Sequence, residues 1–128
     1  MLLLLDTHTF LWFVTNPAAL SRRVLALIQD ADNIIYLSMA SVWEMSIKSN
    51  AGKLQLTLPI QLFVERQTTQ NDFLILPIEL PHLAVVETLA LHHRDPFDRL
   101  LIAQSLAENL PILSVDALFD KYSVIRFW

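Results

Sequence analysis

Four acidic residues stand where the chain is expected to leave a strand or to begin a helix. They are Asp6, Glu44, Asp98 and Asp116. In a parallel sheet the carboxyl ends of all strands meet at one edge, where ligand sites gather. Carboxylates that converge there repel one another, so a fold keeps them together with a cation that offsets the charge. Oxygen ligands of this kind suit Mg²⁺ or Mn²⁺, and the four acids therefore predict a divalent metal site.

Each acid also has an ordinary structural explanation. Asp6 and Asp116 fit helix N-caps, which accept hydrogen bonds from backbone N–H groups. A Ser-Val-Trp-Glu sequence ending at Glu44 fits a capping box. Asp98 fits the third position of a helix capped by Asp95, where the helix dipole favours a negative charge. Taken singly, the cap is the commoner use of each acid, but the expected convergence of all four favours the metal site.

The strand that leads into Asp6 is a run of four leucines, Leu2–Leu5. A run without a polar face is typical of a strand buried on both sides in a parallel sheet. Further strands are expected over 34–37, 73–76, 111–114 and 123–127. Helices are expected over 7–15, after a cap at Ser21, over 38–50, from Pro59, over 80–92, after Asp95 and over 116–122. This alternation predicts an α/β fold with a parallel sheet, built as one domain of residues 1–128.

The composition limits the class of protein. The chain has 128 residues, of which 54% are hydrophobic, and a mean hydropathy of +0.44. No apolar run approaches the ~18 residues that a membrane span requires, and the first residues lack the charged flank of a signal peptide. We therefore expect a cytoplasmic protein without a membrane segment. Its surplus apolar residues favour a surface covered by a partner, most simply in a homodimer.

Charge and cysteine content narrow the chemistry further. The chain has no cysteine, which excludes disulfides and thiolate metal sites. The net charge of −4 argues against broad nonspecific attraction to nucleic acid. Any chemistry on nucleic acid would need a bound cation and a small basic patch. Among the aromatic residues, Phe10, Trp12 and Phe13 are expected in the core or on a partner surface, and Trp43 and Ile47 in the core.

Five short stretches follow one another from the first residues to the last. They are LLDTH (4–8), SMASVWE (38–44), GKL (52–54), HRDPFDRL (93–100) and LSVD (113–116). In this order they resemble a PIN-domain protein of the VapC toxin type. The resemblance implies a three-layer α/β/α fold whose central parallel sheet has the strand order 3-2-1-4-5, with the first strand central.

The same resemblance implies a function. Asp6, Glu44 and Asp98 would bind the metal, and Asp116 would be a more variable fourth acid. The chain would be a Mg²⁺-dependent endoribonuclease, with Mn²⁺ as a substitute, in which metal-activated water attacks an RNA phosphodiester bond. It would form a homodimer and act as the toxin of a type II toxin–antitoxin module, inhibited by a small cognate antitoxin.

Three residues near the acids are expected to support the site. Thr7 can hydrogen-bond a ligand or continue a helix cap. Ser114 can hold an acid in place or end a strand. Asp95 lies close enough in sequence to add negative charge to the site, although an N-cap is its commoner use.

The basic residues offer contacts for RNA phosphates. His93, Arg94 and Arg99 belong to the only dense basic cluster, which lies beside the proposed acids. They are expected to bind RNA phosphates, with solvation of a helix end as the alternative. Lys48 and Lys53 are expected at the same edge of the sheet and are further candidates for phosphate contact.

Two other classes of function compete with the ribonuclease. The first is a haloacid-dehalogenase-like phosphatase that uses Asp6 as a covalent nucleophile. That family has a second aspartate two residues later, where this chain has His8. The second is a non-catalytic PIN-like binding module in which the acids serve only as helix caps.

Overall fold

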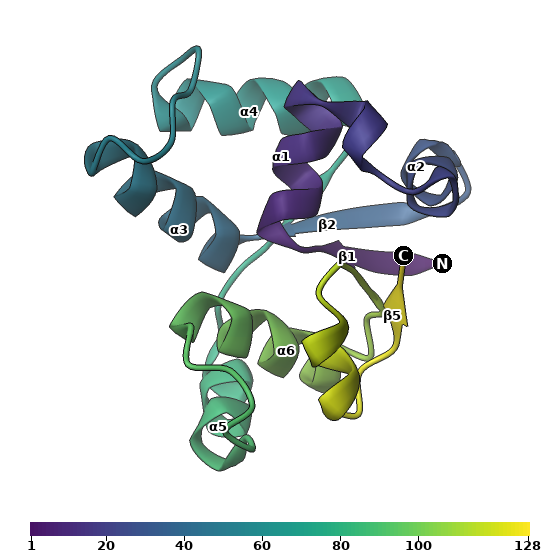
Figure 1. The fold of residues 1–128 in the computed structure, drawn as a ribbon, viewed down its shortest axis with the longest axis vertical. Coiled ribbons are helices and arrows are strands. Elements are labelled where there is room, and N and C mark those ends of the chain that lie inside the picture. The colour runs from purple at the N-terminus through teal and green to yellow at the C-terminus, as the bar shows by residue number, and fades with distance from the viewer.

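The computed structural model describes residues 1–128 as one five-stranded sheet with helices on both faces (Figure 1). The strands are β1 (Leu2–Leu5), β2 (Ile34–Ser38), β3 (Leu74–Leu76), β4 (Ile112–Leu113) and β5 (Arg126–Phe127). All neighbouring strands pair in parallel, in the order β3-β2-β1-β4-β5. The predicted α/β/α fold and its strand order 3-2-1-4-5 are therefore confirmed, with β1 at the centre.

Six α-helices and two 3₁₀ helices connect the strands. The α-helices are α1 (Thr7–Thr15), α2 (Arg22–Gln29), α3 (Met39–Asn50), α4 (Ile60–Asn71), α5 (Leu80–Thr88) and α6 (Pro96–Glu108). The 3₁₀ helices are η1 (Pro17–Ala19) and η2 (Ala117–Lys121). In Figure 1, α1, α2 and α4 lie on one side of β1, and α5 and α6 lie on the other. No helix of the structure has both the length and the apolar character needed to cross a membrane.

The leucine run of β1 divides its side chains between two hydrophobic cores. Leu3 and Leu5 pack in the core beneath α1, α2 and α4, together with Phe10. Leu4 points to the opposite core, beneath α6, where it packs with residues such as Leu101. All three leucines are fully buried, because successive side chains of a strand point to opposite faces. A strand with apolar residues on both faces can occupy only the middle of such a sheet.

Local capping signals set several helix boundaries as predicted. Ser21 Oγ accepts a hydrogen bond from the Val24 N–H at 3.1 Å and caps α2. Ser38 Oγ accepts one from the Ala40 N–H at 3.0 Å and caps α3. The only glycine, Gly52, follows the end of α3 with φ +73°, a conformation that other residues adopt at a cost.

The fifth helix is shorter than predicted. It ends at Thr88 and not at His92, although apolar residues continue to Leu91. One cause lies 30 residues later in the chain. In a helix that continued to His92, the His92 N–H would bond the Thr88 carbonyl, but it donates to the Tyr122 hydroxyl at 3.1 Å. The Arg99 guanidinium donates to the carbonyl oxygens of Leu89 (3.2 Å) and Ala90 (2.9 Å) in the segment after the helix.

Two predictions about α3 were also wrong. Trp43 and Ile47 are exposed and do not belong to the core. Together with exposed Met39 they form a stripe with a spacing of four residues along one side of the helix. Ser41 is not part of a capping box that includes Glu44, because α3 already begins at Met39.

At the other end of the chain, the helix after Asp116 is a 3₁₀ helix, and β4 and β5 have only two residues each.

Candidate active site

The four predicted acids come from four elements that meet at the carboxyl edge of the sheet. Asp6 directly follows β1, and Asp116 comes three residues after the end of β4. Glu44 lies in the second turn of α3, which begins immediately after β2. Asp98 lies in the first turn of α6. The parallel topology thus brings together residues that are separated by up to 110 positions in the sequence.

Asp6 is buried, with only 5% of its surface exposed, and it occupies the N-cap position of α1 without a side-chain cap hydrogen bond. Its Oδ2 accepts a hydrogen bond from Ser114 Oγ at 2.6 Å. Ser114 Oγ in turn accepts one from the Asp116 N–H at 3.0 Å, so Ser114 links two of the acids. Burial raises the pKa of Asp6 above its usual range, although the Ser114 hydrogen bond and the nearby His8 oppose the shift.

Glu44 is as deeply buried as Asp6, at 4% exposure. Its Oε2 lies 2.5 Å from Lys48 Nζ, one helical turn further along α3. The hydrogen bond to Glu44 raises the pKa of Lys48, and the negative charges of Asp95 and Asp98 act in the same direction. The charge of Glu44 is therefore offset by a lysine of its own helix.

Asp98 is the acid whose charge has no partner, since its carboxylate makes no side-chain hydrogen bond or ion pair. Its pKa is raised to about 7, first by burial and then by four neighbouring carboxylates. In order of effect, these neighbours are Asp6, Asp95, Glu44 and Asp116. All four neighbours lie near enough to Asp98 for their negative charges to repel its carboxylate. A cation at this place would relieve the repulsion.

Asp116 is half-buried and has a partner for each of its carboxylate oxygens. Oδ1 caps η2 by accepting the Leu118 N–H at 3.0 Å. Oδ2 lies 3.1 Å from Nε2 of His93. Potential metal-ligand atoms of His93, Asp98 and Asp116 all lie within 4.8 Å of one another. Asp6 and Glu44 do not belong to this group, but they raise the pKa of Asp98 through their charge, as Asp116 does.

The donor atoms of this site match a hard divalent cation. Four carboxylates offer oxygen ligands, and the chain has no cysteine. Mg²⁺ and Mn²⁺ prefer such ligands and keep open positions for water and substrate oxygens. The Asp98 carboxylate has no partner and its pKa is raised, as expected for a ligand whose charge a cation would offset.

The supporting residues have defined contacts. Thr7 Oγ1 donates a hydrogen bond to Ser41 Oγ at 2.8 Å, which joins the first turns of α1 and α3 behind the acids. Asp95 Oδ1 caps α6 by accepting the Phe97 N–H at 2.8 Å. Asp95 also contributes to the raised pKa of Asp98, so it both caps the helix and adds charge.

The basic residues divide into two groups. His93 is only 6% exposed, and Arg99 donates hydrogen bonds to backbone carbonyls of residues 89–93. Both side chains therefore have their polar atoms engaged within the protein. Arg94 and Lys53 are exposed, and the ammonium group of Lys48 is bound to Glu44. The surface cations near the acids are thus Arg94, Lys53 and the partly exposed Lys48.

A cleft of about 370 Å³ lies beside the acids, between α1 and the end of α3. Its lining includes Thr7, which follows Asp6, and Lys48, which contacts Glu44. The lining also includes an aromatic residue, Trp12, and a second lysine, Lys53. Small-molecule sites typically have volumes of roughly 300–1,000 Å³, so the cleft is large enough for part of a ligand that reaches the acids.

Sequence reasoning missed the use made of Tyr122. Its hydroxyl accepts hydrogen bonds from the backbone N–H groups of His92 (3.1 Å) and His93 (2.9 Å). It also lies 3.3 Å from His93 Nδ1. No local pattern marks this tyrosine, because its partners lie about 30 residues earlier in the chain.

Comparisons with known proteins agree with this fold. The family model described as PIN domain matches residues 3–125. VapBC2 from Rickettsia felis, in a structure bound to a DNA fragment from their promoter, superposes with a TM-score of 0.72 at 14% identity, covering 99% of this chain and 98% of that chain. FitAcB from Neisseria gonorrhoeae gives a TM-score of 0.66 at 22% identity, covering 100% and 97%. No curated protein matches the sequence.

Proposed function

The chain belongs to the PIN domain family, and from that premise we propose that it is a Mg²⁺-dependent endoribonuclease. The observation that carries the proposal is the Asp98 carboxylate, which has no partner and whose pKa is raised to about 7 by burial and by the acids around it. Carboxylates that repel one another destabilise the folded protein unless a bound cation offsets their charge. Hydrolysis of a phosphodiester bond is the chemistry that a carboxylate-held cation serves.

The residues have distinct tasks in this proposal. Asp6, Glu44, Asp98 and Asp116 would hold the cation, for which Mn²⁺ is a substitute. A bound Mg²⁺ lowers the pKa of water and offsets charge on phosphoryl oxygens. Ser114 orients the Asp6 carboxylate through its 2.6 Å hydrogen bond. Burial of Asp6 and Glu44 keeps bulk water away from the carboxylates and strengthens their hold on a cation.

The cleft between α1 and α3 is the place where we expect the RNA to lie. Lys53 and Lys48 line it and would contact phosphates on one side of the scissile bond. Trp12 offers an aromatic surface on which a base can stack. Arg94, exposed in the loop before α6, would contact the backbone from the other side. The net charge of −4 makes these few local cations more important than any general attraction.

We also propose that the chain is the toxin of a type II toxin–antitoxin module and forms a homodimer. The supporting observation is the likeness to VapBC2 and FitAcB, whose names denote two-component complexes. The exposed stripe of Met39, Trp43 and Ile47 on α3 offers an apolar surface for a partner chain. The surplus of apolar residues in the composition fits the same proposal.

No observation favours the phosphatase. A covalent nucleophile must be reached by its substrate, but Asp6 is 5% exposed and hydrogen-bonded to Ser114. The binding-module alternative explains Asp116, which caps η2. It does not explain Asp6, whose carboxylate makes no cap hydrogen bond, nor Asp98, whose carboxylate caps nothing.

The proposal is tested by RNA cleavage with the purified protein. We expect end-labelled RNA to be cut with Mg²⁺ or Mn²⁺, to be left intact with EDTA, and to yield 5′-phosphate and 3′-hydroxyl ends. Asp6→Asn and Asp98→Asn should each reduce the rate by more than the roughly 10–100-fold that is typical for loss of an outer partner of a metal ligand. Asparagine keeps the shape of the side chain but is a neutral and poorer ligand for Mg²⁺.

Asp32→Asn is the matched control, because Asp32 is an exposed acid in the turn before β2. It should cut RNA at the wild-type rate. Thermal unfolding of each variant checks that the fold is retained. Cleavage that continues in EDTA, or equal rates for wild type, Asp6→Asn and Asp98→Asn, would show that the four acids are not a catalytic metal site.

A further inference from the structure

His93 is buried against the acid site but has no exposed edge for RNA. Its ring stacks on Tyr122 with an interplanar angle of 25° and meets the edge of Phe119 at a centroid distance of 4.8 Å. Its two nitrogens face Tyr122 and Asp116. The packing therefore fixes the direction of both nitrogens. A buried histidine with a fixed orientation is able to hold the proposed metal ligand that it contacts.

We propose that His93 is a positioning residue, which donates its Nε2–H to Asp116 Oδ2 and thereby aims the Asp116 carboxylate at the cation site. The proposal rests on the proposed metal-dependent nuclease function. In it, Tyr122 and Asp116 together fix the tautomer of His93, and His93 orients Asp116. The result is a relay of hydrogen bonds that runs from a backbone loop to the edge of the acid site.

The tautomer follows from the hydrogen bonds of Tyr122. Its hydroxyl oxygen accepts two backbone N–H groups, from His92 at 3.1 Å and from His93 at 2.9 Å. A hydroxyl oxygen has two acceptor positions and one hydrogen, so only its O–H remains available. His93 Nδ1 lies 3.3 Å from this oxygen and is then the acceptor of that O–H. In a neutral imidazole the proton then resides on Nε2, which faces Asp116 Oδ2 at 3.1 Å.

The same hydrogen bonds exclude His93 as a metal ligand, although its Nε2 lies within 4.8 Å of ligand atoms of Asp98 and Asp116. A ligating Nε2 carries no proton, so Nδ1 would have to carry it and donate. Nδ1 would then donate toward the Tyr122 oxygen, both of whose acceptor positions are occupied. Two donors would face each other in a buried site.

Asp116 needs such a partner more than the other acids do. It is only half-buried, and it precedes and caps a 3₁₀ helix of only five residues. The Leu118 N–H holds Oδ1, and His93 holds Oδ2. Each oxygen keeps one further acceptor position free for a cation. Without His93, the carboxylate can rotate about its remaining hydrogen bond and turn toward solvent.

The first test is the protonation of His93 in the metal-free protein, measured by ¹⁵N NMR of the imidazole rings. We expect the neutral imidazole of wild-type His93 to carry its proton on Nε2. Tyr122→Phe should change the Nδ1 signal, because the donor to Nδ1 is lost, while Asp116 Oδ2 continues to hold the proton on Nε2. A proton on Nδ1 in the wild-type protein would overturn the relay, and this measurement requires neither metal nor RNA.

The second test compares three proteins for Mn²⁺ affinity by calorimetry. His93→Phe keeps an aromatic ring but has no donor, and we expect affinity to fall by roughly 10–100-fold. His93→Gln can place an amide N–H near the position of Nε2, and we expect it to recover part of that loss. Equal stability of the two variants, measured without metal, would show that the difference does not come from packing. A His93→Phe variant with wild-type Mn²⁺ affinity would overturn the proposal.

Failure of the nuclease proposal gives a different result. If the wild-type protein binds Mn²⁺ but does not cut RNA, the proposed activity is wrong, whereas the effect of His93→Phe on Mn²⁺ affinity still tests the relay. If His93→Gln binds Mn²⁺ no better than His93→Phe and both are as stable as wild type, the donor role is wrong even when the nuclease activity is confirmed.

Discussion

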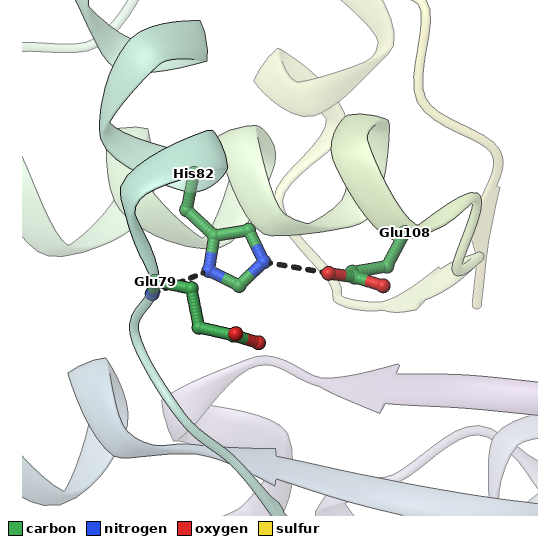
Figure 2. A group of neighbouring side chains, drawn as sticks. All are labelled: Glu79, His82 and Glu108. Carbon is green, nitrogen blue, oxygen red and sulfur yellow. Dashed lines mark hydrogen bonds and ion pairs between the residues drawn. The ribbon is translucent and has the colours of Figure 1, made fainter.

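Two groups of side chains in this molecule bring potential metal ligands equally close together. One is the group of His93, Asp98 and Asp116 at the carboxyl edge of the sheet. The other is Glu79, His82 and Glu108, which joins α5 to α6 on the face of the sheet that these helices cover (Figure 2). In each group the ligand atoms lie within 4.8 Å of one another.

The second group is satisfied by its own hydrogen bonds. His82 is fully buried, and its Nδ1 accepts the Glu79 N–H at 3.0 Å. Its Nε2 therefore carries the proton and donates to Glu108 Oε1 at 2.9 Å. Both glutamates are exposed, so water screens their charges. Figure 2 shows His82 between the two glutamates, with a hydrogen bond on each ring nitrogen.

The two groups differ in whether they hold unpaired negative charge, and not in the distances between their ligand atoms. The acid site buries Asp6 and Glu44 and leaves Asp98 without a partner, so its carboxylates repel one another. The His82 group connects two helices and leaves no buried charge unpaired. A set of ligand atoms within reach of one another therefore indicates a metal site only where the protein leaves a charge for the metal to offset.

The two groups should differ most in how their substitution changes the stabilisation of the protein by Mn²⁺. At a concentration about 100 times the dissociation constant, a bound cation adds about 2.7 kcal/mol to the free energy of unfolding. We expect Glu108→Gln to keep this gain and Asp98→Asn to lose most of it. Glutamine retains an acceptor for His82, which makes Glu108→Gln a suitable control. Denaturant unfolding with and without Mn²⁺ measures both effects, and an equal loss in the two variants would contradict the comparison.

The parts of the fold that the sequence predicted depend on neighbours along the chain. The four leucines of β1, the caps at Ser21 and Ser38 and the turn at Gly52 are local patterns, and the structure has all of them. The strand order came from a resemblance over the whole chain. The positions of the acids followed from the parallel topology, because each comes after a strand or near the start of a helix.

The parts that the sequence did not predict depend on contacts between distant residues. The early end of α5 goes with a distant contact, because the His92 N–H bonds the Tyr122 hydroxyl 30 residues later and not the Thr88 carbonyl. His93 was expected to contact RNA. Its ring instead points into the protein, where it contacts Tyr122 and Asp116, both more than 20 residues later in the chain. Exposed Trp43 has the same spacing as a core residue, since an exposed apolar stripe on a helix shows the same periodicity as a buried one.

A second prediction concerns the structural use of His82. We expect His82→Ala to reduce the free energy of unfolding by about 2–3 kcal/mol, because the Glu79 N–H and the amide of Gln104 lose their acceptor in a buried place. Glu108→Ala removes only the exposed partner and should cost less than about 1 kcal/mol. Urea unfolding compares them. If His82 were a metal ligand, His82→Ala would also abolish stabilisation by Mn²⁺, which we do not expect.

The smallest expected effect is the pH dependence of stability in the metal-free protein. The pKa of Asp98 is raised from 3.8 to about 7, so the folded state binds more protons than the unfolded state between these values. Stability contributed by the protonated carboxyl is therefore lost as the pH rises through this window. We expect the melting temperature of the wild-type protein to fall relative to that of Asp98→Asn between about pH 5 and pH 8.

This difference isolates the acid site, because all histidines and the His82–Glu108 pair are present in both proteins. Added Mn²⁺ should reverse the trend in the wild-type protein, since a cation binds the deprotonated carboxylates and its affinity increases with pH. Glu108→Gln should follow the wild-type curve. Parallel curves for wild type and Asp98→Asn would mean that the acids at the sheet edge do not destabilise one another, and the contrast between a charged site and a satisfied one would be lost.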